Sequence, residues 1–186
     1  MISVVELALL IIVSGVPGSG KTTLADELGR RIAVPVLGKD AIKEGISLTE
    51  GTAATYGGPV ADRAFASLYG CVKVLLGARC SLIIEAAFHR SRFEDDAASL
   101  FPLARTRLIC CTVDTSVAFR RYEERALAGG PGRFAHPDQF VIEEMRSGRF
   151  GWDAYDLASL GMTCLVANTT DVYVPGIDEI VDFAIG

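Results

Sequence analysis

A glycine-rich stretch at residues 15–22 constrains this chain more than any other feature of its sequence. It reads GVPGSGKT and matches G-x-x-x-x-G-K-[ST] at every fixed position, with an apolar run before it and an amphipathic, helix-length segment after it. Glycines let backbone N–H groups surround a phosphate, and the following helix adds the positive end of its dipole. The pattern therefore predicts a nucleotide site formed by Gly15, Val16, Pro17, Gly18, Ser19, Gly20, Lys21, Thr22 and Thr23.

Three side chains in or near this stretch carry specific expectations. Lys21 is expected to reach the β- and γ-phosphates, and the Thr22 hydroxyl to bind Mg²⁺. The strand-like segment 81–85 ends in Glu85, where a metal-serving aspartate is the commoner residue. Glu85 would hold Mg²⁺ through water, orient the substrate, or be satisfied by backbone N–H groups at the end of its strand.

Composition limits the class of protein. The chain has 186 residues, half of them apolar and 22% charged, which suits one compact domain with a substantial core. Its 18 Lys and Arg against 23 Asp and Glu give a formal charge of −5. That charge disfavours, without excluding, a nucleic-acid partner, because such proteins gain affinity by neutralising phosphates.

Cysteine usage and hydropathy indicate the compartment. The five cysteines are odd in number and form no CxxC pair, and there are two histidines, so neither a disulfide framework nor a structural zinc site is expected. Cys110, Cys111 and Cys164 in predicted strands, and Cys71 in a predicted apolar helix, are instead expected to be small core residues. The apolar run at 7–13 is far shorter than the roughly 20 residues of a membrane span, and it is predicted to be a buried strand. We therefore expect a cytoplasmic protein with no membrane partner.

Apolar segments of strand length alternate with helix-length segments along the chain, without internal repeats. This alternation predicts a mainly parallel α/β sheet covered by helices on both faces. Two glycine-rich stretches, 47–59 and 128–137, are predicted to be long loops that are mobile or functional. The predicted strands are near 7–14, 34–38, 81–87, 106–113 and 162–167, and the predicted helices are near 21–32, 40–46, 60–77, 91–100, 115–127, 137–147 and 176–184.

An acidic and a basic residue follow the second predicted strand. Asp40 and Lys43 form a D-x-x-K pattern at an edge of the sheet where ligands bind in α/β proteins. Asp40 is predicted to accept the proton of an attacking hydroxyl, and Lys43 to steady the substrate or the developing phosphoryl charge. The alternative for Asp40 is that it caps the helix that follows it, a role compatible with catalysis.

A group of arginines follows the fourth predicted strand. Arg121 and Arg125 are four residues apart on one predicted helix and so share a face, and Arg133 lies in the glycine-rich loop after it. They predict a lid that closes over the nucleotide and brings guanidinium groups to the transferred phosphoryl. The alternative is that the arginines pair with Glu123 and Glu124 on a solvated face.

Two other classes of phosphate-loop protein are disfavoured. A GTPase needs a guanine-reading N-K-x-D, but residues 168–171 read NTTD, with Thr169 in place of the lysine. Oligomeric AAA+ motors carry a further helical domain and arginine fingers, for which 186 residues leave little room. A small kinase is the class that remains.

Several segments together resemble a known family. The loop at 15–22, the KDxxK after the second strand, the segment LIIEAAFHRSR and the segment RRYEER with its later histidine resemble the P-loop kinases of the polynucleotide 5′-hydroxyl kinase-like AAA type. Zeta-type toxins, chloramphenicol phosphotransferase-like proteins, and shikimate and gluconate kinases are more distant relatives. The resemblance covers nearly the whole chain and is most specific at the loop.

The resemblance implies an architecture. It is a P-loop NTPase three-layer sandwich with a five-stranded parallel sheet in the order 2-3-1-4-5 and a helical lid. A single P-loop kinase domain would span residues 1–186, with the lid near 115–147 and a substrate-side insertion near 41–78.

The resemblance also implies a chemistry, the transfer of the γ-phosphoryl group of Mg-ATP to a hydroxyl. Asp40 aligns with the acceptor-activating aspartate, and either Arg121 or Arg125 aligns with the lid arginine. Asn168 and Thr169 would lie against the adenine, with a lid arginine such as Arg121 on its other face.

The acceptor site is predicted less sharply. His89, Arg90 and Arg92 follow the third strand, where an arginine would bind an acidic group or phosphate and His89 would make a polar contact. With Asp40, Lys43 and Arg133 they form the predicted substrate site, and Tyr56 and Phe65 would line a pocket for a ring.

Three acceptors stay open. A small-molecule hydroxyl of antibiotic, sugar or nucleoside type is favoured over a polynucleotide 5′-hydroxyl and over a nucleoside monophosphate. A nucleotide-binding regulatory module is the non-enzyme alternative, and a monomer or homodimer is expected.

Overall fold

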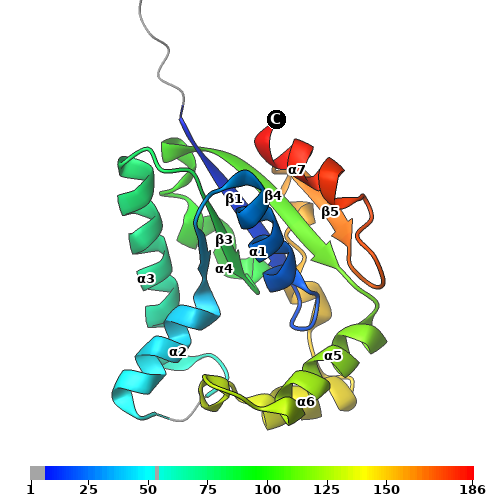
Figure 1. Ribbon diagram of the computed structural model, residues 1–186. Coiled ribbons are helices and arrows are strands. Elements are labelled where there is room, and N and C mark those ends of the chain that lie inside the picture. Colours follow the sequence, from blue (N-terminus) through cyan, green and yellow to red (C-terminus); the bar gives the residue numbers. More distant parts are fainter. Residues whose placement is uncertain (1–6, 53–54) are drawn as a thin grey trace, which may run out of the picture.

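The computed structural model describes residues 7–52 and 55–186. Five parallel strands form one sheet in the order β2-β3-β1-β4-β5 (Figure 1), which confirms the expected α/β architecture and strand order. The strands are β1 (Ala8–Gly15), β2 (Val36–Gly38), β3 (Leu82–Ala86), β4 (Ala104–Thr112) and β5 (Cys164–Asn168).

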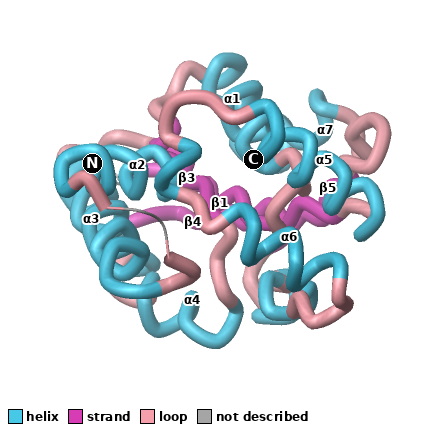
Figure 2. The backbone as a smooth tube through the Cα atoms, turned by 90° about the horizontal axis from the view of Figure 1, so that it is seen from below, coloured by secondary structure: helices cyan, strands magenta, loops and turns pink. Residues whose placement is uncertain are grey.

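Helices cover both faces of the sheet, so the fold is a three-layer sandwich (Figure 2). Side chains of β1 alternate between two cores, with Leu10 and Ile12 facing α3 and α4, and Ile11 and Val13 facing α1 and α7. Every residue of β1 is buried, as its unbroken apolar run predicts. These helices are α1 (Lys21–Ile32), α3 (Gly58–Gly77), α4 (Arg90–Ala97) and α7 (Ile177–Ile185).

Two further helices lie beyond the carboxyl ends of the strands, opposite α2 (Lys39–Glu50) (Figure 1). They are α5 (Thr115–Ala128) and α6 (Asp138–Arg146), and both fall inside the segment 115–147, which we call the lid segment. The lid segment has a small apolar cluster of its own around Tyr122, Val141 and Met145. The open end of the sheet thus lies between α2 and the lid segment.

The structure corrects three details of the sequence-based map. The predicted loop at 47–59 is shorter, because α2 continues to Glu50 and α3 begins at Gly58; residues 53–54 lie outside the described residues. The helix predicted to reach residue 100 ends at Ala97, just before a short 3₁₀ turn at Phe101–Leu103 that contains a proline. Cys71, expected in the core with the strand cysteines, is exposed on α3.

Hydropathy of the helices bears on membrane association. Among the helices of the described residues, none has the length and apolar character needed to cross a bilayer.

Candidate active site

The glycine-rich loop joins the end of β1 to the start of α1. Gly18 and Gly20 adopt φ values of +85° and +73°, a left-handed region that glycine enters without strain. A Cβ on Gly18 would overlap the backbone carbonyl of Ala118 in α5, so the loop passes this helix at a distance that excludes a side chain. The backbone therefore has the form of a cradle that a phosphate group fits.

A buried ion pair lies beside this loop. Lys21 and Glu85 are 7% and 5% exposed, and Lys21 Nζ lies 3.8 Å from Glu85 Oε1. Lys21 Nζ also donates to the Val16 carbonyl at 3.5 Å. Burial raises the pKa of the Glu85 carboxyl, and the nearby Lys21 ammonium and Thr22 hydroxyl oppose that rise. The Lys21 ammonium is thus held beside the loop by the Glu85 carboxylate and the Val16 carbonyl.

Oxygen donors at the loop suit a magnesium ion. Thr22 and Glu85 line one cavity of about 420 Å³ together with Asp40, which we call the Thr22 cavity. Hydroxyl and carboxylate oxygens are ligands that Mg²⁺ accepts. No group of three or more His, Cys, Asp or Glu side chains within residues 7–52 and 55–186 is arranged to hold a metal alone. A magnesium ion here would therefore take further ligands from phosphates and water.

A second cavity lies on the other side of the loop, between α1 and the segment after β5. It has a volume of about 530 Å³ and is lined by Gly20, Thr23, Arg121, Thr169, Asp171, Val172 and Tyr173; we call it the Arg121 cavity. The Thr169 hydroxyl donates to the Ser19 carbonyl at 2.6 Å, which ties this segment to the loop. Asn168 does not line the cavity, because its side chain accepts from the Thr170 N–H at 2.8 Å.

Asp40 lies in the first turn of α2. Gly38 occupies the cap position, so the alternative in which Asp40 caps this helix is wrong. The Asp40 carboxylate instead lies 2.5 Å from Lys39 Nζ. Burial favours the neutral acid, but the positive charges of Lys39, Lys21 and His136 outweigh it and hold the Asp40 pKa well below its usual range. The carboxylate is therefore ionised near neutral pH.

The cavity at Asp40 is the meeting point of the sequence-predicted residues. It measures about 420 Å³ and is walled by the loop, α2, α3, the segment after β3 and the lid segment; we call it the Asp40 cavity. Tyr56 and Phe65 line it, as expected. Lys43 is 6% exposed, and burial together with nearby Lys39 lowers its pKa. The predicted members that line it are Pro17, Lys21, Asp40, Lys43, His89, Arg92 and Arg125.

The two arginines predicted to share one face serve different cavities. Arg121 lines the Arg121 cavity and donates to the Thr170 carbonyl at 2.7 Å. Arg125 lines the Asp40 and Thr22 cavities, with its guanidinium 5.3 Å from the centre of the Tyr122 ring. The pairing alternative does not hold for them, since Glu123 and Glu124 pair with Arg146 and Arg120.

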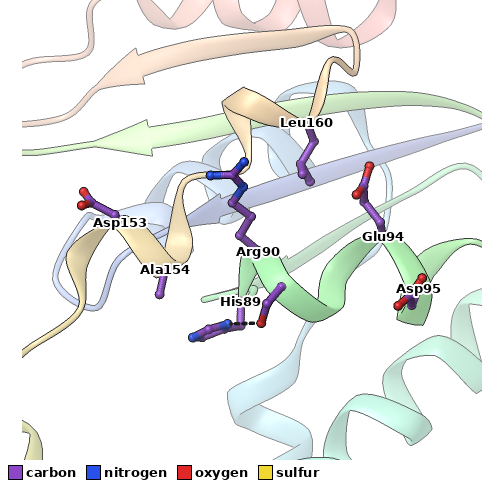
Figure 3. Close-up of a pocket in the computed structure, with 8 residues that line it drawn as sticks. His89, Arg90, Glu94, Asp95, Asp153, Ala154 and Leu160 are labelled. Atoms are coloured by element: carbon purple, nitrogen blue, oxygen red, sulfur yellow. Dashed lines mark hydrogen bonds between the residues drawn. The ribbon is translucent and has the colours of Figure 1, made fainter.

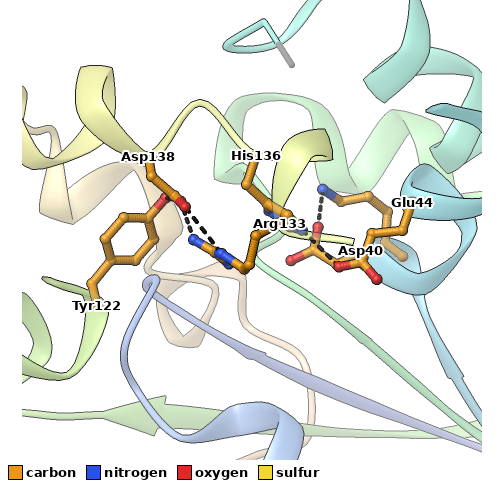
Figure 4. A network of polar contacts seen from close by, with 7 residues as sticks. Asp40, Glu44, Tyr122, Arg133, His136 and Asp138 are labelled. Carbon is orange, nitrogen blue, oxygen red and sulfur yellow. Dashed lines mark hydrogen bonds and ion pairs between the residues drawn. The ribbon is translucent and has the colours of Figure 1, made fainter. Parts of the chain in front are cut away.

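Arg133 belongs to a network inside the lid segment (Figure 4). Its guanidinium pairs with Asp138, with Arg133 Nε donating to Asp138 Oδ2 at 3.0 Å. Tyr122 donates its hydroxyl proton to the same carboxylate at 3.0 Å. Arg133 also borders the Thr22 cavity, so this network supports the lid side of that cavity.

The residues after β3 divide at the start of α4. His89 and Arg92 line the Asp40 cavity, and Arg92 pairs with Asp62 at 3.0 Å. Arg90 points to the other side, into a separate cavity of about 480 Å³ that Asp153 also lines (Figure 3). That cavity shares His89 with the Asp40 cavity, so the structure brings Arg90 to His89 but not into the cavity that Asp40, Lys43 and Arg92 line.

Four residues of the site were given no individual role in the sequence-based prediction. Lys39 precedes Asp40 directly, and its position in the KDxxK pattern is a signal that the sequence contained. Glu44, His136 and Tyr155 reach the cavities from α2, from the lid segment and from the turn after it. Only the tertiary arrangement brings these three to the site; His136 is the histidine that follows RRYEER in the resemblance, and no sequence pattern marks Glu44 or Tyr155.

Fold and site together have the arrangement of the P-loop kinases: a 2-3-1-4-5 sheet, a glycine-rich loop after its central strand and a helical segment facing that loop. A family model described as an AAA domain matches residues 10–150, so the chain belongs to that AAA-domain family. Among the curated proteins, none matches the sequence.

Solved structures resemble this chain over most of its length. A candidate kinase from Chloroflexus aurantiacus J-10-fl is 28% identical, with a TM-score of 0.76, and the match covers 95% of this chain and 96% of that one. A sugar kinase from Janibacter sp. HTCC2649 is 16% identical, with a TM-score of 0.64 and coverage of 95% and 94%. A chain of the Pnkp1/Rnl/Hen1 RNA repair complex is 17% identical, with a TM-score of 0.59 and coverage of 81% and 49%. The last two share the fold with this chain.

Proposed function

We propose that this protein is an ATP-dependent kinase that transfers the γ-phosphoryl group to a hydroxyl of a small molecule, of antibiotic, sugar or nucleoside type. One observation carries the proposal: Lys21 of the phosphate-binding loop and the ionised Asp40 line the same cavity of about 420 Å³. A phosphoryl group at the loop and a hydroxyl beside Asp40 would therefore meet in one cavity.

The chain's own groups suit each part of this transfer. The acceptor oxygen forms a bond to the γ-phosphorus, the bond to the β–γ bridging oxygen breaks, and the hydroxyl proton passes to Asp40. Because the Asp40 pKa is low, the proton moves late, once the phosphorus has drawn charge from the oxygen. Lys21 and Arg125 would stabilise the negative charge of the transferred group, and the lid segment would keep water from it.

The remaining expected residues have supporting roles. A magnesium ion held by Thr22 and Glu85 would neutralise phosphate charge when bound. The Arg121 cavity would take the base, between Arg121 and Thr169, while Lys43, His89, Arg92 and Arg133 would surround the acceptor. We assign these parts to a single domain over 1–186, with the lid at 115–147 and the acceptor-side insertion at 41–78.

ADP release measured with Mg-ATP and a panel of hydroxyl compounds tests the proposal. The panel holds sugars, nucleosides, aminoglycoside-type antibiotics, nucleoside monophosphates and a 5′-hydroxyl oligonucleotide. We expect a small-molecule hydroxyl to stimulate release. Stimulation by the oligonucleotide or by a nucleoside monophosphate alone would contradict the acceptor class, and stimulation by no compound would favour a regulatory nucleotide-binding module.

The variant Asp40→Asn tests the chemistry. Because the proton acceptor is lost, transfer should fall by about 10²- to 10⁴-fold while the affinity for ATP is kept. Asp95→Asn, which removes a carboxylate from the separate cavity at Arg90, is the matched control and should transfer normally. An Asp40→Asn protein that transfers the phosphoryl group to the acceptor at the unaltered rate would exclude the role given to Asp40.

A further inference from the structure

A turn of the lid segment rests on one side chain of α2. His136 Nε2 lies 2.7 Å from Glu44 Oε1, and the His136 side chain is 10% exposed. The two residues are 92 positions apart in the chain, so this contact joins the two sides of the open end of the sheet. Figure 4 shows His136 directed toward Glu44 across the gap between the lid segment and α2.

The same turn closes around Glu44 from a second direction. Gly132 has a φ of +82°, and a Cβ at this position would overlap the Glu44 carboxylate. The lid turn at 132–136 therefore contacts Glu44 through a bare backbone position and through a hydrogen-bonded imidazole. Two independent contacts on one side chain indicate a built docking point, since a chance surface pair would show a single contact.

The docking point lies at the border of the Thr22 cavity. Glu44 lies one helical turn after Asp40, and with His136 it borders the Thr22 cavity. Arg125 and Arg133 border the same cavity from the lid side. The lid turn is thus held at the edge of the space where the phosphoryl group would be transferred.

We propose that Glu44 is a positioning residue, which docks the lid turn at 132–136 through His136 and so holds the lid arginines over the transfer site. The kinetic part of this inference rests on the proposed kinase function. The structural part, that Glu44 fixes the lid turn, stands without it.

The docking point is separate from the cavity proposed for the nucleotide base. The Arg121 cavity is lined by residues of the loop, α1, α5 and the segment after β5, with none from α2 or from the turn at 132–136. Loss of Glu44 should therefore change acceptor use and leave nucleotide affinity alone. A general loss of folded structure would instead weaken both.

Limited proteolysis tests the docking without any activity measurement. Arg133 lies inside the turn, and its side chain is 15% exposed because it pairs with Asp138. In Glu44→Ala the turn should leave α2, and trypsin should cut after Arg133 about tenfold faster, as loss of a charged hydrogen bond allows. Glu50→Ala is the matched control, because it removes a carboxylate from the same helix that pairs with Arg63. Equal cutting rates in Glu44→Ala and the unaltered protein would overturn the proposal.

Kinetics with the acceptor found in the panel tests the positioning role. Glu44→Ala should lower kcat/KM for the acceptor about tenfold and change the ATP dissociation constant by less than about twofold. Glu44→Gln, which can still accept a hydrogen bond from His136, should recover part of the loss. An equal loss of nucleotide affinity would show a structural defect and contradict the positioning role.

A double-mutant cycle isolates the contact itself. If Glu44 acts through His136, the double variant Glu44→Ala/His136→Ala should be no worse than the poorer single variant, in both cutting rate and kcat/KM. Additive losses would overturn the proposal. If no acceptor is ever phosphorylated, the proposed function fails, and the cutting rates still decide whether Glu44 docks the lid.

Discussion

The two sides of the site are built in different ways. On the nucleotide side, the predicted phosphate cradle consists of nine consecutive residues at 15–23, and their backbone geometry follows from glycines at fixed positions. On the acceptor side, the Asp40 cavity takes its walls from α1, α2, α3, the segment after β3 and the lid segment. One side is therefore a local property of the chain, whereas the other exists only in the folded molecule.

This difference bears on what each side can vary. A phosphate cradle made of backbone N–H groups tolerates little change, since Gly18 has no room for a Cβ. A cavity walled by side chains from five places can change its occupant by single substitutions while the fold persists. We therefore expect the nucleotide side to define the class of the protein and the acceptor side to define its particular substrate.

The largest expected effect comes from removing the lysine of the nucleotide side. Lys21→Met should lower kcat/KM for transfer by about 10³-fold, because a preorganised positive charge at the phosphoryl group is lost. Lys73→Met, on the exposed face of α3, is the control and should keep the unaltered rate. A loss of less than about tenfold in Lys21→Met would break the assignment of the transfer chemistry to the loop.

The same variant has a pH-dependent effect on stability. Burial raises the pKa of Glu85 in the folded state, so the folded protein binds this proton more readily than the unfolded chain, and stability falls as pH rises above the usual glutamate range. Without the Lys21 ammonium that pKa rises further. The variant should match the unaltered protein at acid pH and lose about 3 kcal/mol near neutral pH, as urea titrations at a series of pH values would measure. A pH-independent difference would contradict this account of the pair.

The sequence predicted the nucleotide side in more detail than the acceptor side, because the first is a local segment and the second is assembled from distant segments. The fold, the loop and the position of Asp40 follow from local patterns, and the structure confirms the strand order. The division between Arg90 and Arg92 was missed because the helix was expected from residue 91. A helix that begins at Arg90 turns these two residues about 200° apart, as two steps of an α-helix require.

Helical spacing could not predict that Arg121 and Arg125 line different cavities. Residues four apart share a helix face, but their long side chains end more than a turn from their backbone. Arg121 reaches the Thr170 carbonyl, and Arg125 lies over the Tyr122 ring. Tyr122 lies three residues before Arg125 on the same helix, whereas Thr170 belongs to the segment after β5, which only the folded chain brings near Arg121.

Arg121 and Arg125 lie on the same helix but line cavities on the two sides of the site, so substituting each in turn compares the two sides. Arg125→Ala should lower kcat about 10²-fold with little change in ATP affinity, because its charge faces the transfer site. Arg121→Ala should weaken ATP binding about tenfold with little change in kcat. Arg120→Ala, an exposed neighbour that pairs with Glu124, is the control. Nucleotide titrations and initial rates separate the two effects, and matching profiles for both variants would contradict the separation of the cavities.

The smallest expected effect is at the outer wall of the acceptor side. Tyr56 and Tyr155 both line the Asp40 cavity, and their hydroxyl oxygens lie 3.1 Å apart. Burial raises the pKa of Tyr155, as does its contact with Tyr56, so Tyr155 keeps its proton and the bond is available throughout the neutral range. Because the bond is exposed, Tyr155→Phe should shift the free energy of unfolding by less than about 1 kcal/mol.

The KM for the acceptor should nevertheless change. Tyr155→Phe and Tyr56→Phe remove the same bond, so each should raise the acceptor KM about two- to fivefold and the double variant no further, while the KM for ATP stays constant. Tyr173→Phe, in the Arg121 cavity, is the control for the opposite side. A change in the KM for ATP in the Tyr56 or Tyr155 variants would show that the two sides are coupled. An acceptor that ignores both substitutions would bind deeper, near Asp40 and Lys43, with its specificity set by the charged end of the cavity.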